Sequence, residues 1–234
     1  MSNPMARRVW ISGASSGLGL ELVEQLLEQG AQVAASGPSA EALQALARQF
    51  ASRLLLLDSN LTEPFAAQQA AKHIADRWGA LDCLIINAGT CDYLAPDTPA
   101  AAMFEGIVRS NLSASRHCLE NALALLQHGR SPQVVGILSR YSSLQLGDPR
   151  QPATSDNSVM QLLNAQRTAL AAKSIGLTIV APKSLNYSQT PVQVTPQGWT
   201  AQSAATAILE RLPDRSANLV LEALQLNSLW PLPR

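Results

Sequence analysis

Three glycines and three serines stand close together in the stretch SGASSGLG, residues 12–19, between an apolar run and an amphipathic pattern. Glycines at such a junction let the backbone turn sharply and bring its N–H groups close to a bound anion. The N-terminus of the following helix would favour a phosphate there. A tight turn with close helix packing needs the same residues, so both interpretations are open. The residues concerned are Ser12, Gly13, Ser15, Ser16, Gly17, Leu18 and Gly19.

Other polar residues stand where apolar runs end. Asp58 ends the run RLLLLD, Asn87 lies in INAG, and Ser139 ends QVVGILS, whereas Asn111 lies inside a long helical stretch. The carboxyl ends of parallel strands meet at one edge of a sheet, which is where ligands bind in open α/β folds. We therefore expect a site along that edge.

Six short apolar runs alternate with helical patterns and are interpreted as strands. They cover residues 8–12, 32–36, 53–58, 81–87, 133–139 and 177–181. Their nearly continuous apolar character is typical of parallel strands covered on both faces by helices. The sequence thus predicts an α/β fold in which residues 1–234 form a single domain: a Rossmann-like, doubly wound parallel sheet in three layers, α/β/α.

Two segments rich in Gly, Pro, Ser and polar residues interrupt this alternation. Residues 140–158 and 182–199 are predicted to be loops that follow strand ends and contact the substrate. The tail that begins ANLVLEA, at residue 217, fits either a last edge strand or a short helix.

Composition excludes several classes of function. Of the 234 residues, 47% are hydrophobic and 15% charged, and 17 basic residues balance 17 acidic ones. Without a positive field we expect no nucleic-acid partner, and no apolar run reaches the ~18 residues of a membrane span. Cys83, Cys91 and Cys118 lack the paired spacing of a metal site and fit reduced thiols in the cytoplasm. No metal site is expected.

Together, the glycine loop, Asp58, INAG, Asn111 and the run to Ser139 resemble the short-chain dehydrogenase/reductase family over most of the chain. The resemblance implies NAD or NADP as cofactor, held by the glycine loop, with Asp58 bonded to the adenine. It also implies that Ser139 contacts a substrate carbonyl and that Asn111 holds a water in a proton relay. Further cofactor contacts would come from Ser59, Asn87, Ala88, Gly89, Pro182 and Thr190.

The expected determinant of cofactor choice is missing after the second predicted strand. NAD-binding proteins of this fold carry an acidic residue there and NADP-binding ones a basic residue. This chain has Gly37 and Pro38 instead, with Ser36 and Ser39 as the nearby polar side chains. Ser36 is therefore a candidate contact, and the choice between NAD and NADP is open.

The chain departs from the family at its Tyr-x-x-x-Lys pair. Four residues after Tyr93, Tyr141 and Tyr187 come Asp97, Gln145 and Pro191. The best local match to the family helix is LNAQRTAL, residues 163–170, which has Leu163 for the tyrosine and Arg167 for the lysine. Arg167 would then hydrogen-bond the ribose, although its planar guanidinium is not equivalent to an ammonium group. Tyr141 and Tyr187 are the candidate replacement acids.

Three hypotheses follow. The first is NAD(P)-dependent oxidoreduction of a small carbonyl or alcohol substrate with a non-standard proton donor. The second is a non-redox enzyme, such as a dehydratase, cyclase or aldol-type catalyst, and the third is a catalytically silent dinucleotide-binding or oligomer partner. The resemblance also implies a homodimer or homotetramer paired through the helices at 103–127 and 159–172, although burial within one subunit explains their apolar faces equally well.

Overall fold

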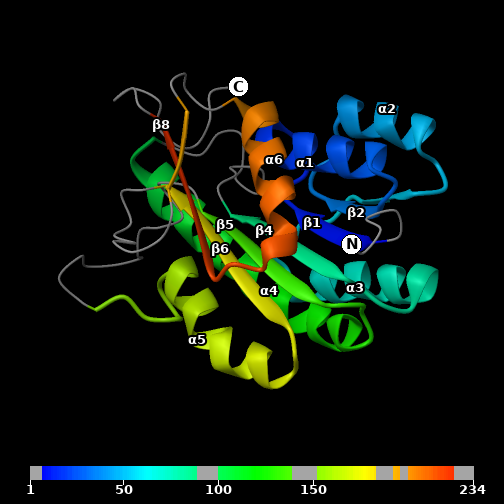
Figure 1. The fold of residues 1–234 in the computed structure, drawn as a ribbon. Coiled ribbons are helices and arrows are strands. Elements are labelled where there is room, and N and C mark those ends of the chain that lie inside the picture. The colour runs from blue at the N-terminus through cyan, green and yellow to red at the C-terminus, as the bar shows by residue number, and fades with distance from the viewer. Residues whose placement is uncertain (1–6, 89–99, 139–151, 183–191, 196–199, 224–234) are drawn as a thin grey trace.

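The computed structural model describes residues 7–88, 100–138, 152–182, 192–195 and 200–223. These residues contain an eight-stranded sheet, ordered β3-β2-β1-β4-β5-β6-β8-β7, in which every neighbouring pair is parallel (Figure 1). The strands are β1 (Arg8–Ser12), β2 (Gln32–Ser36), β3 (Leu54–Leu57), β4 (Cys83–Ala88), β5 (Gln133–Leu138), β6 (Gly176–Pro182), β7 (Val192–Thr195) and β8 (Asn218–Ala223).

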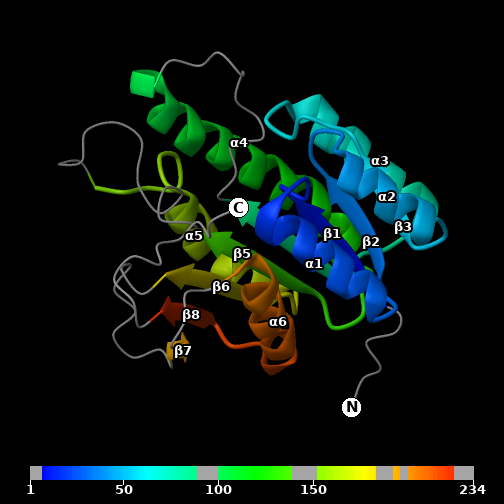
Figure 2. The ribbon, with the colours of Figure 1, turned by 90° about the horizontal axis from the view of Figure 1, so that it is seen from above.

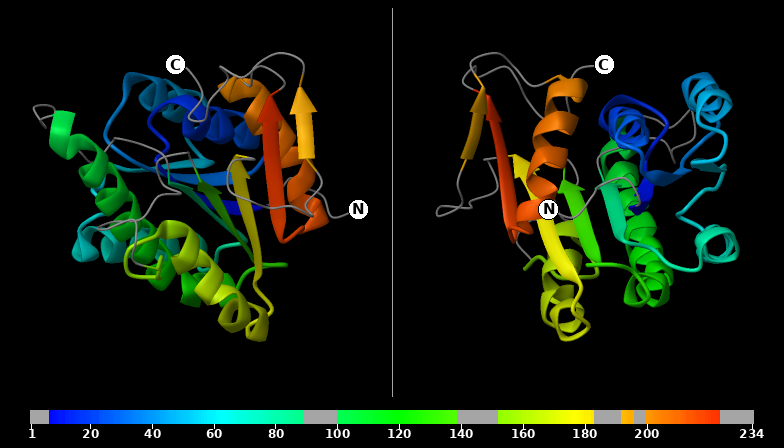
Figure 3. Two further views of the ribbon diagram at one scale, coloured as in Figure 1. Left: turned by 90° about the vertical axis from the view of Figure 1, so that its left-hand side faces the viewer. Right: turned by 45° about the vertical axis from the view of Figure 1, so that its right-hand side comes forward.

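Helices cover both faces of the sheet, as the views in Figures 2 and 3 show. One apolar core joins the sheet to three helices, and a second core joins its other face to the remaining three. The helices on the first face are α3 (Pro64–Trp78), α4 (Ala100–Gln127) and α5 (Val159–Ala172). The helices on the second face are α1 (Gly17–Glu28), α2 (Glu41–Gln49) and α6 (Ala201–Arg211). A short 3-10 helix, η3 (Leu212–Asp214), follows α6. This arrangement confirms the predicted three-layer α/β/α fold.

Local signals in the sequence explain where several helices begin and end. Pro64 starts α3, where its missing N–H costs no helical hydrogen bond, and Gly79 ends that helix with φ 70°. At α6, the hydroxyl of Thr200 accepts from the Ser203 backbone N–H at 3.0 Å, and the Thr200 backbone N–H donates to the Ser203 hydroxyl. These caps fix the ends of helices on both faces of the sheet.

The chain reverses its direction of winding between β1 and β4. From β1 it proceeds through β2 to β3, and it then crosses to β4 on the other side of β1. Crossover loops leave in opposite directions at such a point, and in open α/β sheets the ligand crevice lies outside the carboxyl ends of the two strands. The glycine turn follows β1 and therefore lies at this crevice.

The far edge of the sheet differs from the prediction. The segment 182–199 was expected to be a loop, but residues 192–195 form β7, the edge strand, and Pro182 is the last residue of β6. The tail is a strand, β8, rather than a helix, yet it lies between β6 and β7 instead of at the edge. Local sequence could not show this because β7 pairs with residues that come later in the chain.

Within the described ranges, no helix combines the length and apolar character that crossing a membrane requires.

Candidate functional site

The glycine turn after β1 has a backbone that favours glycine at two points. Gly13 and Gly17 adopt φ values of 62° and 52°, in the left-handed region that side chains disfavour. Gly19 has a different constraint, because a Cβ there would collide with the carbonyl oxygen of Gly13. Helix α1 therefore packs directly on the turn, as both interpretations of the sequence required.

Asn87 fastens this turn to β4. Its side-chain Nδ2 donates to the Gly13 carbonyl at 2.9 Å, and its backbone N–H donates to the hydroxyl of Ser12 at 3.2 Å. Asn87 and Ser12 are both buried. The predicted partners from INAG and the glycine loop thus meet at the carboxyl ends of β1 and β4. Ala88 is the last residue of β4.

The N-terminus of α1 is left open toward solvent. Ser16 is the N-cap residue, but its side chain makes no capping hydrogen bond. Gly17 is exposed, and a Cβ built on it meets no atom within 4 Å. The first N–H groups of a helix need partners from outside it and carry a partial positive charge. This end of α1 can therefore hold a phosphate group, with Leu18 buried beneath it.

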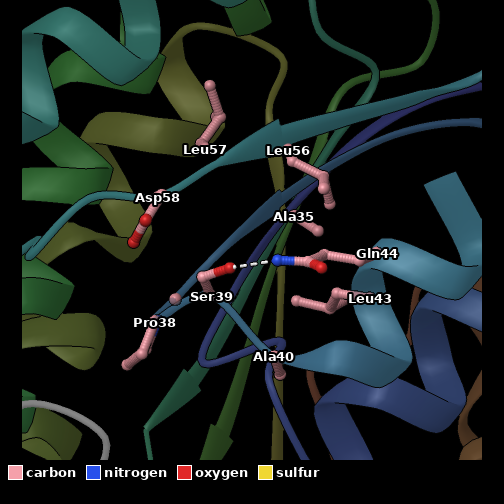
Figure 4. A pocket seen from close by; sticks show the side chains of 10 residues that line it. Ala35, Pro38, Ser39, Ala40, Leu43, Gln44, Leu56, Leu57 and Asp58 are labelled. Carbon is pink, nitrogen blue, oxygen red and sulfur yellow. Dashed lines mark hydrogen bonds between the residues drawn. The ribbon is translucent and has the colours of Figure 1, made fainter.

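A recess lies beside the turn, between β2, α2 and β3 (Figure 4). Asp58, which the family resemblance places near an adenine, is one of the residues that line it. Ser59 follows, and its hydroxyl donates to the Leu57 carbonyl at 3.3 Å. The Ser15 hydroxyl of the glycine turn donates to the Pro38 carbonyl at 2.8 Å, which ties the turn to this recess.

Gln44, which no pattern in the sequence indicated, lines the recess from the first turn of α2. Its side-chain Nε2 donates to the Ser39 hydroxyl at 2.8 Å, as Figure 4 shows. Leu43 and Leu46 are the buried residues of this helix, and Gln44 is the polar neighbour that follows Leu43. Only the placement of α2 against the end of β3 shows that this polar residue faces a recess.

Ser36 is not a cofactor contact in this structure. It has no exposed surface, and its hydroxyl accepts a hydrogen bond from the indole Nε1 of Trp10 at 2.8 Å. A buried indole N–H needs such an acceptor, which explains the serine at this position. The prediction for Ser36 was wrong because the residue points into the core shared with α3 and α4.

Arg167 does not lie with the residues of the glycine turn. Its guanidinium donates to the carbonyls of Leu177 at 3.2 Å and Ala217 at 3.1 Å, and to Asn218 Oδ1 at 2.9 Å. These residues stand where β6 and β8 begin, whereas Ser12 and Asn87 stand where β1 and β4 end. The expected contact between Arg167 and a nicotinamide ribose is therefore wrong.

The reason is the register of α5. Leu163, the residue matched to the family tyrosine, is fully buried against Gly136, where a Cβ would collide with its Cδ1. The helix begins only after Ser158, so LNAQRTAL lies in its middle and end, under the sheet. The turn before the helix is held by Arg116 of α4, whose guanidinium donates to Asp156 Oδ1 at 3.0 Å and to the Ser155 carbonyl.

Asn111 lies on α4 with 2% of its surface exposed, and its carbonyl accepts from the Ser115 hydroxyl at 2.6 Å. Pro182 ends β6 at the predicted edge. The remaining predicted residues lie outside the part of the chain that the structure describes: Ser139, Tyr141, Tyr187, Gly89 and Thr190.

The two cysteines that the structure describes, Cys83 and Cys118, are both buried. Burial raises the pKa of Cys83 to about 11 and also raises the pKa of Cys118, so both thiols stay protonated at neutral pH. The same residues contain no group of three or more His, Cys, Asp or Glu side chains that could hold a metal ion.

A model of the short chain dehydrogenase family matches residues 7–197. The chain belongs to this family. The match begins just before β1 and ends beyond β7, so it includes the glycine turn, the recess and all the strands except β8.

Individual relatives agree with this assignment. The chain is 40% identical over 108 residues to a 3-phenylpropionate-dihydrodiol/cinnamic acid-dihydrodiol dehydrogenase of Escherichia coli O17:K52:H18, a match that covers 45% of this chain and 40% of the relative. The chain thus matches two fifths of that protein's length. Two solved structures share the fold. Pseudomonas aeruginosa RhlG in an NADP active-site complex has a TM-score of 0.70 and 19% identity, over 97% of this chain and 99% of that chain. NADH-dependent reductase A1-R′ complexed with NAD has a TM-score of 0.69 and 16% identity, over 94% of this chain and 96% of that chain.

Proposed function

We propose that this protein binds a nicotinamide dinucleotide, NAD(H) or NADP(H), and catalyses oxidoreduction of a small carbonyl or alcohol substrate. One observation carries the proposal: the open N-terminus of α1 follows a glycine turn fastened by Asn87 at the crevice between β1 and β4. Family membership and the dehydrogenase among its relatives support the same function. One structural neighbour binds NADP and another NAD, so the fold alone does not select between them.

The residues present fit the pyrophosphate of such a cofactor. Gly17 leaves space in front of the first turn of α1, and no side-chain cap takes up its N–H groups. Backbone N–H groups at a helix N-terminus can then bind the phosphate oxygens. Asn87 maintains the shape of the turn by holding the Gly13 carbonyl away from the phosphate.

The bound nicotinamide would accept or donate the hydride. The chain's own residues would orient the substrate and move the proton, with Ser139 hydrogen-bonded to the substrate oxygen and Asn111 holding a water. Tyr141 or Tyr187 would supply the acid, because Leu163 cannot move a proton and Arg167 binds the starts of β6 and β8. A tyrosine in this role needs a neighbouring cation that favours its ionised form.

A pair of glycine variants tests the binding site. Gly17 and Gly79 both have positive φ, 52° and 70°, and a Cβ added to either would meet no atom within 4 Å. Gly17→Ala and Gly79→Ala should therefore each lose about 1–2 kcal/mol of stability. Only Gly17→Ala places a methyl group before the α1 N-terminus, so we expect it alone to weaken NADH and NADPH binding, by at least about tenfold.

The measurement is a fluorescence titration of each variant with NADH and NADPH, followed by a screen of carbonyl substrates for loss of nicotinamide absorbance. Binding with turnover supports the proposal. Binding without turnover would indicate a catalytically silent dinucleotide-binding protein. No binding of either nucleotide to the folded protein would contradict the proposal and leave a non-redox enzyme as the next candidate.

A further inference from the structure

We propose that the recess between β2, α2 and β3 selects a dinucleotide without a 2′-phosphate, so that the chain binds NAD(H) in preference to NADP(H). The proposal rests on the proposed function, because it requires the adenosine half of the cofactor to reach this recess. The recess is defined by Ala35, Gly37, Pro38, Ser39, Ala40, Leu43, Gln44, Leu56, Leu57 and Asp58.

The recess adjoins the turn that would hold the pyrophosphate. The backbone N–H of Ala14 donates to the Ser36 carbonyl at 3.1 Å, and the Ser15 hydroxyl donates to the Pro38 carbonyl at 2.8 Å. A Cβ on Gly37 would collide with the Ser15 hydroxyl, so the two loops are in direct contact. A ribose joined to a phosphate on α1 therefore lies next to this recess.

The charges around the recess disfavour a 2′-phosphate. None of the described residues that line it is a lysine or arginine, whereas Asp58 lines it and Glu41 is the first residue of α2. A phosphate monoester carries about −1.5 to −2 charges at neutral pH. The N-terminus of α2 contributes only roughly half a positive charge, which Glu41 offsets. A 2′-phosphate would therefore meet net repulsion.

Several hydrogen-bond donors that a phosphate would need already have partners. The Ser15 hydroxyl donates to Pro38, and the Gly37 backbone N–H donates to the Leu57 carbonyl at 3.4 Å. Pro38 has no N–H to donate. The Gln44 amide group donates to Ser39 at 2.8 Å. A 2′-phosphate placed in the recess would therefore have no lysine or arginine among the described lining residues to pair with, and the donors named above would not be available to it.

A ribose 2′-hydroxyl has smaller requirements. It needs one acceptor or one donor, and the exposed Ser39–Gln44 pair offers both: the Gln44 amide oxygen can accept, and the Ser39 hydroxyl can donate its own proton. In Figure 4 the two side chains point toward each other across the recess. This neutral pair takes the place of the acidic residue that usually binds the hydroxyl in NAD-binding proteins of this fold.

Fluorescence titrations of the full chain with NADH and NADPH test the proposal. We expect wild-type protein to bind NADH at least about tenfold more tightly, with a smaller ratio at high ionic strength because salt screens the repulsion. Gln44→Arg adds a cation to the recess and should tighten NADPH binding at least about tenfold, with little change for NADH.

Gln49→Arg is the matched control, because it adds the same charge at the opposite end of α2 and should leave the ratio unchanged. NADPH binding by wild-type protein that equals or exceeds NADH binding would overturn this inference and leave the proposed function standing. An equal gain from Gln49→Arg would also overturn it, since the effect would not depend on the recess. If neither nucleotide binds, the proposed function fails and the inference fails with it.

Discussion

At the scale of single residues, Asn87 joins the two strands that flank the crevice. Its amide group donates to Gly13 in the turn after β1, and its backbone donates to Ser12 at the end of that strand. Both bonds are buried, so neither is replaced by water when it is lost. The shape of the glycine turn therefore depends on a residue from another strand.

Asn87→Ala should lower the affinity for NADH by about tenfold and the free energy of unfolding by about 1–2 kcal/mol, because the Gly13 carbonyl loses its buried donor. Titration with NADH and urea denaturation measure the two effects. Asn121→Ala is the control: Asn121 also donates its amide to a carbonyl, that of His117, but this bond lies within α4 and not at the turn. Equal loss of affinity in both variants would contradict the role of Asn87.

The sequence predicted a cofactor contact for both Asn87 and Ser36, and the structure contradicts the one for Ser36 for a physical reason. Both residues stand near strand ends, but the direction of a side chain depends on what packs against it. Asn87 meets the glycine turn, whereas Ser36 meets the indole of Trp10 in the neighbouring strand. The partner of Ser36 lies 26 positions away and gives no local signal.

At the scale of elements, the helix α5 shows how a sequence match can be shifted along the chain. The match of LNAQRTAL to the family helix depends on residue types alone. The structure starts α5 at Val159, places Leu163 against Gly136 and places Arg167 at the starts of β6 and β8, so the motif does not face the crevice.

Arg167→Ala should reduce stability by about 2–3 kcal/mol, because the guanidinium satisfies two carbonyls and Asn218 where β6 and β8 begin. It should leave the NADH affinity unchanged. Arg109→Ala is the control, since its surface pair with Glu105 is more than half exposed on both sides and contributes less than ~1 kcal/mol. If the Arg167→Ala protein is stable but no longer binds NADH, Arg167 is part of the cofactor site and this prediction is contradicted.

At the scale of the whole molecule, the most buried ion pair among the described residues lies at the opposite edge of the sheet from the crevice. Asp82 precedes β4, and its carboxylate accepts from the Arg8 side chain at 2.7 and 3.0 Å and from the backbone N–H groups of Arg8 and Arg130. Burial alone would raise the pKa of Asp82, but these hydrogen bonds and the Arg8 charge outweigh it and lower the pKa. The pair stabilises the start of the central strands.

This lowered pKa predicts an acid-sensitive fold. The stabilisation from Asp82 is present above its unfolded-state pKa, near 3.8, and is lost as the pH falls through the lower folded-state value. The free energy of unfolding should therefore decrease between about pH 5 and pH 2, as urea denaturation at each pH would measure. Asp82→Asn should make the free energy of unfolding depend less on pH in this range, and should lower it by about 2–4 kcal/mol at pH 7. If the variant shows the same pH profile as the wild type, Asp82 is not the group responsible.

Most of the sheet could be predicted because six strands are apolar runs that their helices separate in the chain. The edge strand could not be predicted, since β7 has only four residues, VQVT, and its partner β8 comes later in the chain. The recess was equally hidden, because it combines the loop after β2, the helix α2 and the end of β3. Such features depend on how elements meet and not on any one segment.

The order β6-β8-β7 has a consequence for synthesis. Residues 192–195 emerge from the ribosome before residues 218–223, so the edge strand β7 cannot pair until its neighbour β8 has been synthesised. Until α6 and β8 have been translated, the side of β6 that β8 will cover is an open edge. The last parallel pair to form in the newborn chain is thus the one farthest from the glycine turn, whose strands are complete long before translation ends.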